Sequence, residues 1–115
     1  MKLPTSRFRI GIDLGTSNSA LCYLDQEDLT HQLHCFEVPQ WIGSGEWHDQ
    51  KILPSHAFLL TKEEKLSGRF KLPWSDDSEP NLAIGEWARQ QQALRPGRNI
   101  HSAKSWLCYH NLNPE

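Results

Sequence analysis

The sequence predicts a mixed α/β architecture in which a meander of strands is followed by short helices. Two apolar runs near the start of the chain have the pattern of strands, and residues with high helix propensity are concentrated after residue 85. Strands followed by helices are typical of layered α/β or α+β domains. A length of 115 residues suffices for one modest core or for part of a larger domain.

The first two strands are expected on either side of a short polar turn. In "RFRIGIDL", residues 7–14, apolar side chains alternate with the others. One face of this strand carries Phe8, Ile10, Ile12 and Leu14, and the other carries Arg9, Gly11 and Asp13. The second run, "SALCYLD" at residues 19–25, is apolar on both faces, which is typical of a strand in a covered sheet.

The middle of the chain alternates between weaker strand patterns and polar segments. Residues 30–38 are expected to form a third strand that Pro39 interrupts, because proline cannot donate to a strand ladder. Residues 40–52 have the composition of a loop, with Gly43 and Gly45 as breakers.

A fourth strand is expected within residues 53–61, after Pro54. The polar residues 62–80 then form an exposed insertion in this interpretation. The last third of the chain predicts a short strand at residues 82–84, a helix at 86–94 and a second helix at 99–110.

The ends of the two predicted helices carry recognisable signals. Pro96 and Gly97 stop the first helix, and Asn99 or Ser102 caps the second. The apolar face of the second helix, formed by Ile100, Ala103 and Leu107, would still need a packing partner. This pattern suggests a fragment of a larger domain.

Composition limits the classes of function. The formal net charge of −2 gives no reason to expect nucleic acid or an anionic membrane as a partner. The sequence contains no apolar run of about 18 residues and no apolar signal core near its start, so a cytoplasmic location is expected. Cys22, Cys35 and Cys108 form no CxxC pair, which indicates reduced thiols acting as small buried hydrophobic residues.

Residues 13–18 have the composition of a phosphate-binding turn. Gly15 would allow close backbone approach, and Thr16, Ser17 and Asn18 would add short donors for phosphate oxygens. Asp13 could hold the water shell of Mg²⁺. The turn is not a Walker loop, since GxxxxGK[ST] is absent, and the same residues are also common in an ordinary hairpin.

Three segments in order resemble one family. "IGIDLGTSNSAL" at residues 10–21 is similar to the first phosphate motif of the actin-like ATPase superfamily, and "LPSHAFLL" at 53–60 is similar to a following strand. "LAIGEWARQQQALRPGRNIHSAKSWL" at 82–107 resembles the corresponding segment of DnaK-type (heat-shock protein 70) chaperones. The chain thus resembles the first part of their nucleotide-binding domain.

The resemblance implies an actin-like (ribonuclease H-like) fold, with ATP or ADP and Mg²⁺ as cofactors. Asp13 would lie near Mg²⁺, residues 15–18 would wrap the β- and γ-phosphates, and Lys104 would position the attacking water. In that family ATP hydrolysis controls the binding of unfolded clients, with co-chaperones as further partners. The second phosphate motif, the adenosine motif and the peptide-binding domain are absent here, so the 115 residues alone are expected to be inactive.

Some features depart from the family and leave alternatives open. Ser17 replaces a threonine, Ser105 stands where an arginine is usual, and the span from Asp13 to Lys104 is long, which indicates a divergent bacterial relative. The alternatives are an actin-like filament ATPase and a non-catalytic interaction domain. Zinc binding, a Ser-His-Asp triad and base stacking by the tryptophans are not favoured, because ligand pairs, a GxSxG motif and a basic patch are all missing.

Overall fold

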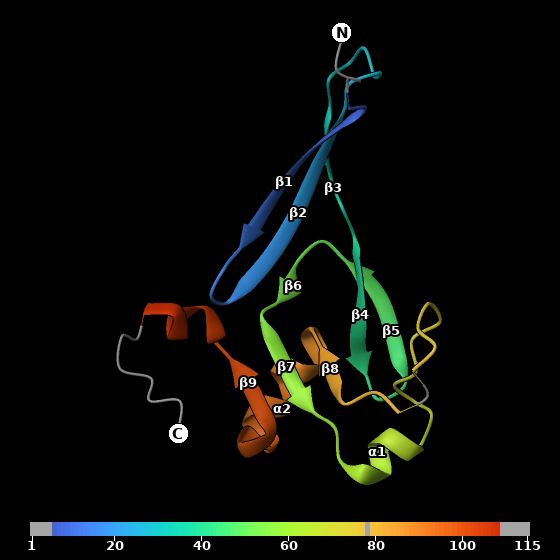
Figure 1. Cartoon of the computed structure of the whole chain (residues 1–115), viewed down its shortest axis with the longest axis vertical. Helices are drawn as coiled ribbons and strands as arrows, with labels where there is room; N and C mark the ends of the chain where they lie inside the picture. The colour runs from blue at the N-terminus through green and yellow to red at the C-terminus, as the bar shows by residue number, and fades with distance from the viewer. Residues whose placement is uncertain (1–5, 78, 109–115) are drawn as a thin grey trace, which may run out of the picture.

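The apolar runs near the start of the chain form the first antiparallel sheet (Figure 1). In the computed structural model, which describes residues 6–77 and 79–108, β1 (Phe8–Leu14) pairs with β2 (Asn18–Asp25). β2 also pairs with β3 (Leu33–Cys35) and, at its other end, with β6 (Leu53–Pro54). The two predicted first strands are confirmed, and the third is shorter than predicted.

A β-hairpin replaces the loop predicted at residues 40–52, so that prediction is wrong. β4 (Val38–Gly43) pairs antiparallel with β5 (Glu46–Gln50), and Gly45 in the connecting turn has a φ of +77°. Pro39 does not interrupt a strand but lies within β4, opposite Asp49. Proline is tolerated there because this sheet has two strands, so each strand has an open edge that needs no donor.

The third sheet has β7 (His56–Leu59) at its centre, with β8 (Leu82–Ile84) and β9 (Asn99–His101) antiparallel to it on either side. The strands expected within 53–61 and at 82–84 are therefore confirmed. The helix predicted at 99–110 is wrong over its first residues, because Asn99–His101 gains ladder pairing with β7.

A short 3₁₀-helix, η2 (Ala103–Cys108), follows β9, and residues 109 and 110 lie outside the described residues. Ser102 separates the two elements with a φ of +54°. Asn99 does not cap the following helix, because it lies in β9, its amide nitrogen donates to the carbonyl oxygen of Ala88 and its amide oxygen lies 3.1 Å from His56 Nδ1.

Two short α-helices occur among the described residues. α1 (Lys62–Leu66) begins with a capping box between Thr61 and Glu64, and α2 (Glu86–Leu94) confirms the predicted helix. The 3₁₀-helix η1 (Pro96–Arg98) follows α2 at the predicted stop. Within the described part of the chain, neither helix is long or apolar enough to cross a membrane.

The hydrophobic core lies where α2 packs against β4 and β7. It consists of Trp41, Phe58, Leu60, Phe70, Ala83, Trp87 and Ala88. Phe70 stands between two tryptophans, with ring centroids 5.3 Å from Trp41 and 4.7 Å from Trp87. Most of the segment 62–80 is exposed as expected for an insertion, yet Phe70 is 1% exposed, so this segment also contributes a core residue.

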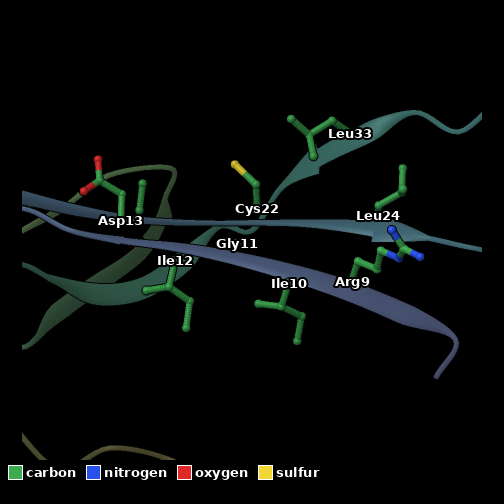
Figure 2. Close-up of a pocket in the computed structure, with 9 residues that line it drawn as sticks. Arg9, Ile10, Gly11, Ile12, Asp13, Cys22, Leu24 and Leu33 are labelled. Carbon is green, nitrogen blue, oxygen red and sulfur yellow. The ribbon is translucent and has the colours of Figure 1, made fainter.

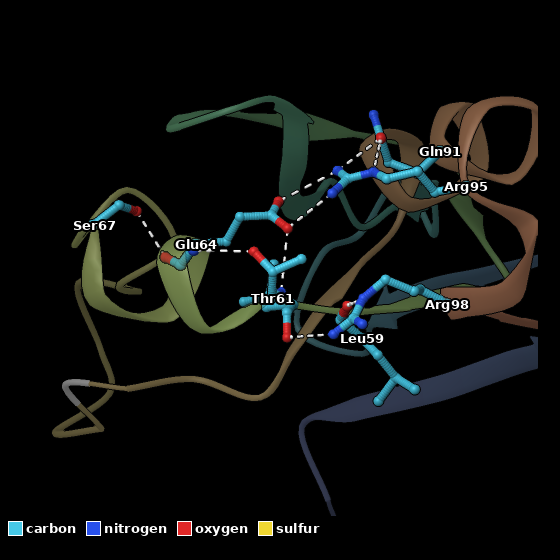
Figure 3. A network of polar contacts seen from close by, with 8 residues as sticks. Leu59, Thr61, Glu64, Ser67, Gln91, Arg95 and Arg98 are labelled. Atoms are coloured by element: carbon cyan, nitrogen blue, oxygen red, sulfur yellow. Dashed lines mark hydrogen bonds and ion pairs between the residues drawn. The ribbon is translucent and has the colours of Figure 1, made fainter.

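Arg95 joins the two helices (Figure 3). Its guanidinium donates to both carboxylate oxygens of Glu64, at 2.9 and 3.3 Å, and to Oε1 of Gln91. It also lies 4.4 Å from the ring centroid of Phe58. Burial raises the pKa of the Glu64 carboxyl, but hydrogen bonds from Arg95 and Thr61 outweigh it, so the net pKa is lowered.

The first sheet extends away from this core (Figure 1). Every residue of β1 is exposed, and its apolar side chains, Phe8, Ile10, Ile12 and Leu14, are 45–65% exposed. β2 is half-buried along most of its length rather than covered on both faces. The expectation of a covered sheet is thus not met within the described residues.

Candidate functional site

The candidate phosphate-binding turn, residues 15–18, joins β1 to β2. Thr16, Ser17 and Asn18 are exposed, and Gly15 is half-buried. A Cβ atom on Gly15 would overlap the backbone carbonyl oxygen of Asn18. Glycine is therefore required by the close approach of the backbone to itself across the turn.

Ser55, between β6 and β7, donates hydrogen bonds to this turn. Its hydroxyl donates to the carbonyl oxygen of Gly15 at 2.8 Å, and its backbone N–H donates to the carbonyl oxygen of Ser17 at 2.9 Å. The hydroxyls of Ser55 and Ser19 are 3.1 Å apart. Two carbonyl groups of the turn therefore have their hydrogen-bond partners in a distant segment.

The backbone N–H groups of Thr16 and Ser17 donate to no other group in the described part of the chain. The carbonyl groups on either side are occupied by Ser55, so the N–H groups and the short hydroxyls remain available at the surface. Successive free N–H groups in a turn form a concavity that favours anions. The turn therefore leaves two backbone N–H groups and three short polar side chains at the surface.

Asp13 lies on β1, on the face that also carries Arg9 and Gly11, and its carboxylate is exposed (Figure 2). Figure 2 shows it pointing to the same side of the sheet as Cys22 and away from Ile12. This face forms an open groove of about 620 Å³. Residues 6–77 and 79–108 contain no cluster of three acidic, histidine or cysteine side chains that could hold a metal, so Mg²⁺ at Asp13 would keep most of its water.

Lys104 is exposed in η2, not on the α-helix that the sequence predicted. Ile100, which the sequence placed on the apolar face of the same helix, belongs instead to β9. Strand pairings connect the turn to the segment that carries Lys104. Asn18 pairs with Pro54, and His56 pairs with His101, which precedes Lys104 by three residues.

Comparison of the chain with protein-family models, curated proteins and solved structures finds no match. The candidate site is therefore defined by its own geometry. The structure brings Asp13 and residues 15–18 together at one end of the first hairpin. Lys104 follows β9, which is connected to this hairpin through the pairing of β2 with β6 and the pairing of β7 with β9.

Sequence reasoning missed Ser55 as a site residue. The signal for it is its position directly after Pro54 in "LPSHAFLL", at the start of the predicted strand. The prediction that the cysteines are small buried hydrophobic residues is also wrong for two of them. Cys35 is exposed and Cys22 is half-buried, whereas the side chain of Cys108 lies outside the described residues.

Proposed function

We propose that this chain forms the first phosphate-binding part of an ATP-binding domain of the DnaK (heat-shock protein 70) type, with an actin-like fold. One observation carries the proposal. The turn at residues 15–18 presents free backbone N–H groups and hydroxyls, while Ser55 occupies its carbonyl oxygens. The order of the three similar segments along the chain supports the same assignment.

Each site residue has a defined role in this proposal. Residues 15–18 bind the β- and γ-phosphates through backbone N–H groups and hydroxyls. Asp13 would hold Mg²⁺ through its water shell, and Lys104 would neutralise charge and orient the attacking water. Phosphoryl transfer depends mostly on such positioning and electrostatic stabilisation, and the bound metal supplies further neutralisation of phosphate charge.

In the complete system, ATP hydrolysis would be coupled to the binding or folding of client polypeptides in the cytoplasm. The motifs for the second phosphate contact and for adenosine are absent from these 115 residues. We therefore expect this chain alone to bind nucleotide weakly, through the phosphates only, and to hydrolyse none.

The experiment is an amide NMR titration of the chain with magnesium ATP. We expect shifts at Thr16 and Ser17 that saturate in the millimolar range, and smaller shifts elsewhere. Gly15→Ala should abolish them, because its Cβ has no room beside Asn18. Gly11→Ala is the matched control, because a Cβ at Gly11 meets nothing within 4 Å. Shifts that persist in Gly15→Ala would contradict the proposal.

A second candidate is a non-catalytic interaction domain, which the exposed apolar face of β1 favours. In that case the turn is only a hairpin turn, and Asp13→Ala would leave the ATP titration unchanged. The third possibility, an actin-like filament ATPase, predicts that the full-length protein sediments with ATP as a polymer. A full-length protein that stays monomeric with ATP would contradict it.

A further inference from the structure

Cys22 on β2 and Cys35 on β3 are directly opposite each other, and their Sγ atoms are 3.6 Å apart. The backbone N–H of Phe36 donates to the carbonyl oxygen of Leu21 at 2.8 Å. The neighbouring pair, Cys22 and Cys35, is therefore a non-hydrogen-bonded pair, in which opposite Cα atoms approach to about 4.5 Å. That separation lies within the range that a disulfide spans, about 4.4–6.8 Å.

Both thiols can be reached from solvent. Cys35 is exposed, and Cys22 is half-buried on the groove face where Figure 2 shows it pointing outward beside Leu33. The hydrogen bond with the Cys35 sulfur, together with partial burial, raises the pKa of the Cys22 thiol. Cys35 is the more exposed thiol and therefore meets an oxidant first, and Cys22, directly opposite it, is positioned to react second.

We propose that Cys22 and Cys35 are a redox-active pair that forms a reversible disulfide between β2 and β3. With oxidised glutathione as oxidant, the Cys35 thiolate attacks one sulfur, forms a mixed disulfide and releases one glutathione. The Cys22 thiolate then attacks the Cys35 sulfur and releases the second glutathione. The protein loses two electrons and two protons, and both are recovered in the two glutathione thiols.

The test is oxidation of the full chain with oxidised glutathione in native buffer, followed by alkylation and mass spectrometry of non-reduced peptides. We expect a Cys22–Cys35 cross-link, an intact mass lower by two hydrogen atoms, and full reversal by dithiothreitol. Because closing the loop restricts the unfolded chain, the oxidised form should also unfold at a higher urea concentration.

Variants separate the proposed pair from chance reactivity. Cys108→Ser should oxidise like the wild type, because the opposed pair remains. Cys22→Ser removes the second thiol, so a glutathione adduct on Cys35 should accumulate to at least about tenfold the wild-type level. In concentrated urea the wild type should give mixed linkages that include Cys108, since the register that pairs Cys22 with Cys35 is lost.

Three outcomes would overturn the proposal. They are cross-links to Cys108 as the main native product, stable glutathione adducts on the wild type without a cross-link, and the same product ratio in native buffer as in urea. The test contains no nucleotide, so its result is independent of the proposed ATP site. Failure of either proposal leaves the other standing.

Discussion

The hydroxyl of Ser55 donates to the carbonyl oxygen of Gly15 at 2.8 Å, across 40 positions of sequence. The same residue binds Ser17 through its backbone and Ser19 through its side chain. The candidate phosphate turn is therefore shaped by a segment that belongs to another part of the fold.

Ser55→Ala removes both side-chain contacts and keeps the backbone hydrogen bond to Ser17. We expect the free energy of unfolding to fall by about 1 kcal/mol, because the Gly15 carbonyl loses its partner in a half-buried site. Urea unfolding followed by tryptophan fluorescence measures this change. Ser55→Thr keeps the hydroxyl and serves as the control. Equal losses in the two variants would show that the hydroxyl is not responsible.

Gly85→Ala should lower the free energy of unfolding more than Gly97→Ala does. Gly85 is buried with a φ of +108°, and a Cβ there would lie 2.6 Å from Oε1 and 2.9 Å from Cβ of Gln40. We expect a loss of about 2–3 kcal/mol in the free energy of unfolding. Gly97→Ala is the control, since a Cβ there meets nothing within 4 Å, and it should change stability by no more than about 0.5 kcal/mol. Similar urea midpoints for the two variants would contradict this prediction.

Gln40→Leu tests a buried amide that connects β4 to α2. Gln40 is 3% exposed, its Nε2 donates to the carbonyl oxygen of Ile52, and its Oε1 accepts from the backbone N–H of Glu86, both at 2.9 Å. Leucine has similar volume but leaves both groups without partners, so we expect a loss of about 2–4 kcal/mol. Gln50→Leu, at an exposed position of β5, should have little effect in the same thermal or urea unfolding assay.

Glu64→Gln tests the acid sensitivity of the contact between α1 and α2. The net pKa of Glu64 is lowered in the folded chain, so its carboxylate stabilises the fold above its unfolded pKa of about 4.3. That contribution is lost as the pH falls through the lower, folded pKa. We expect Glu64→Gln to be less stable than the wild type at pH 7 by about 1 kcal/mol, because Arg95 is partly exposed and solvent screens the pair.

The difference between wild type and Glu64→Gln should shrink toward zero as the pH falls below the folded pKa of Glu64. Urea midpoints measured across the acid range check this convergence. The exposed neighbour Glu63 gives the matched control, Glu63→Gln, which should run parallel to the wild type at every pH. A constant difference between wild type and Glu64→Gln would contradict the prediction.

The sequence predicted the elements whose patterns are local. The alternation in residues 8–14 and the helix propensity of residues 86–94 were sufficient for β1 and α2. The hairpin of β4 and β5 was missed because its glycine was interpreted as a loop breaker, although Gly45 serves a two-residue turn. β9 was missed because its strand state depends on pairing with β7, which no local pattern records.

The candidate site, too, has features that a local sequence pattern indicates and features that depend on strand pairing. The turn composition indicated a glycine that allows close approach to a phosphate, whereas the close approach in the structure is to the backbone carbonyl oxygen of Asn18. The part played by Ser55 depends on a contact between β2 and β6, and the opposition of Cys22 and Cys35 depends on the register of β2 with β3. Such relationships become visible only when the strands are paired.

The core lies away from β1, so β1 can open locally while the core stays folded. All core residues lie between Trp41 and Ala88, whereas β1 is exposed along its whole length. Amide hydrogens of β1 should therefore exchange with solvent through local openings that leave α2 intact. A ligand bound to residues 15–18 would slow amide hydrogen exchange in β1 and β2 without changing it in α2. The reason is that it stabilises the β1–β2 hairpin, which opens while α2 stays folded.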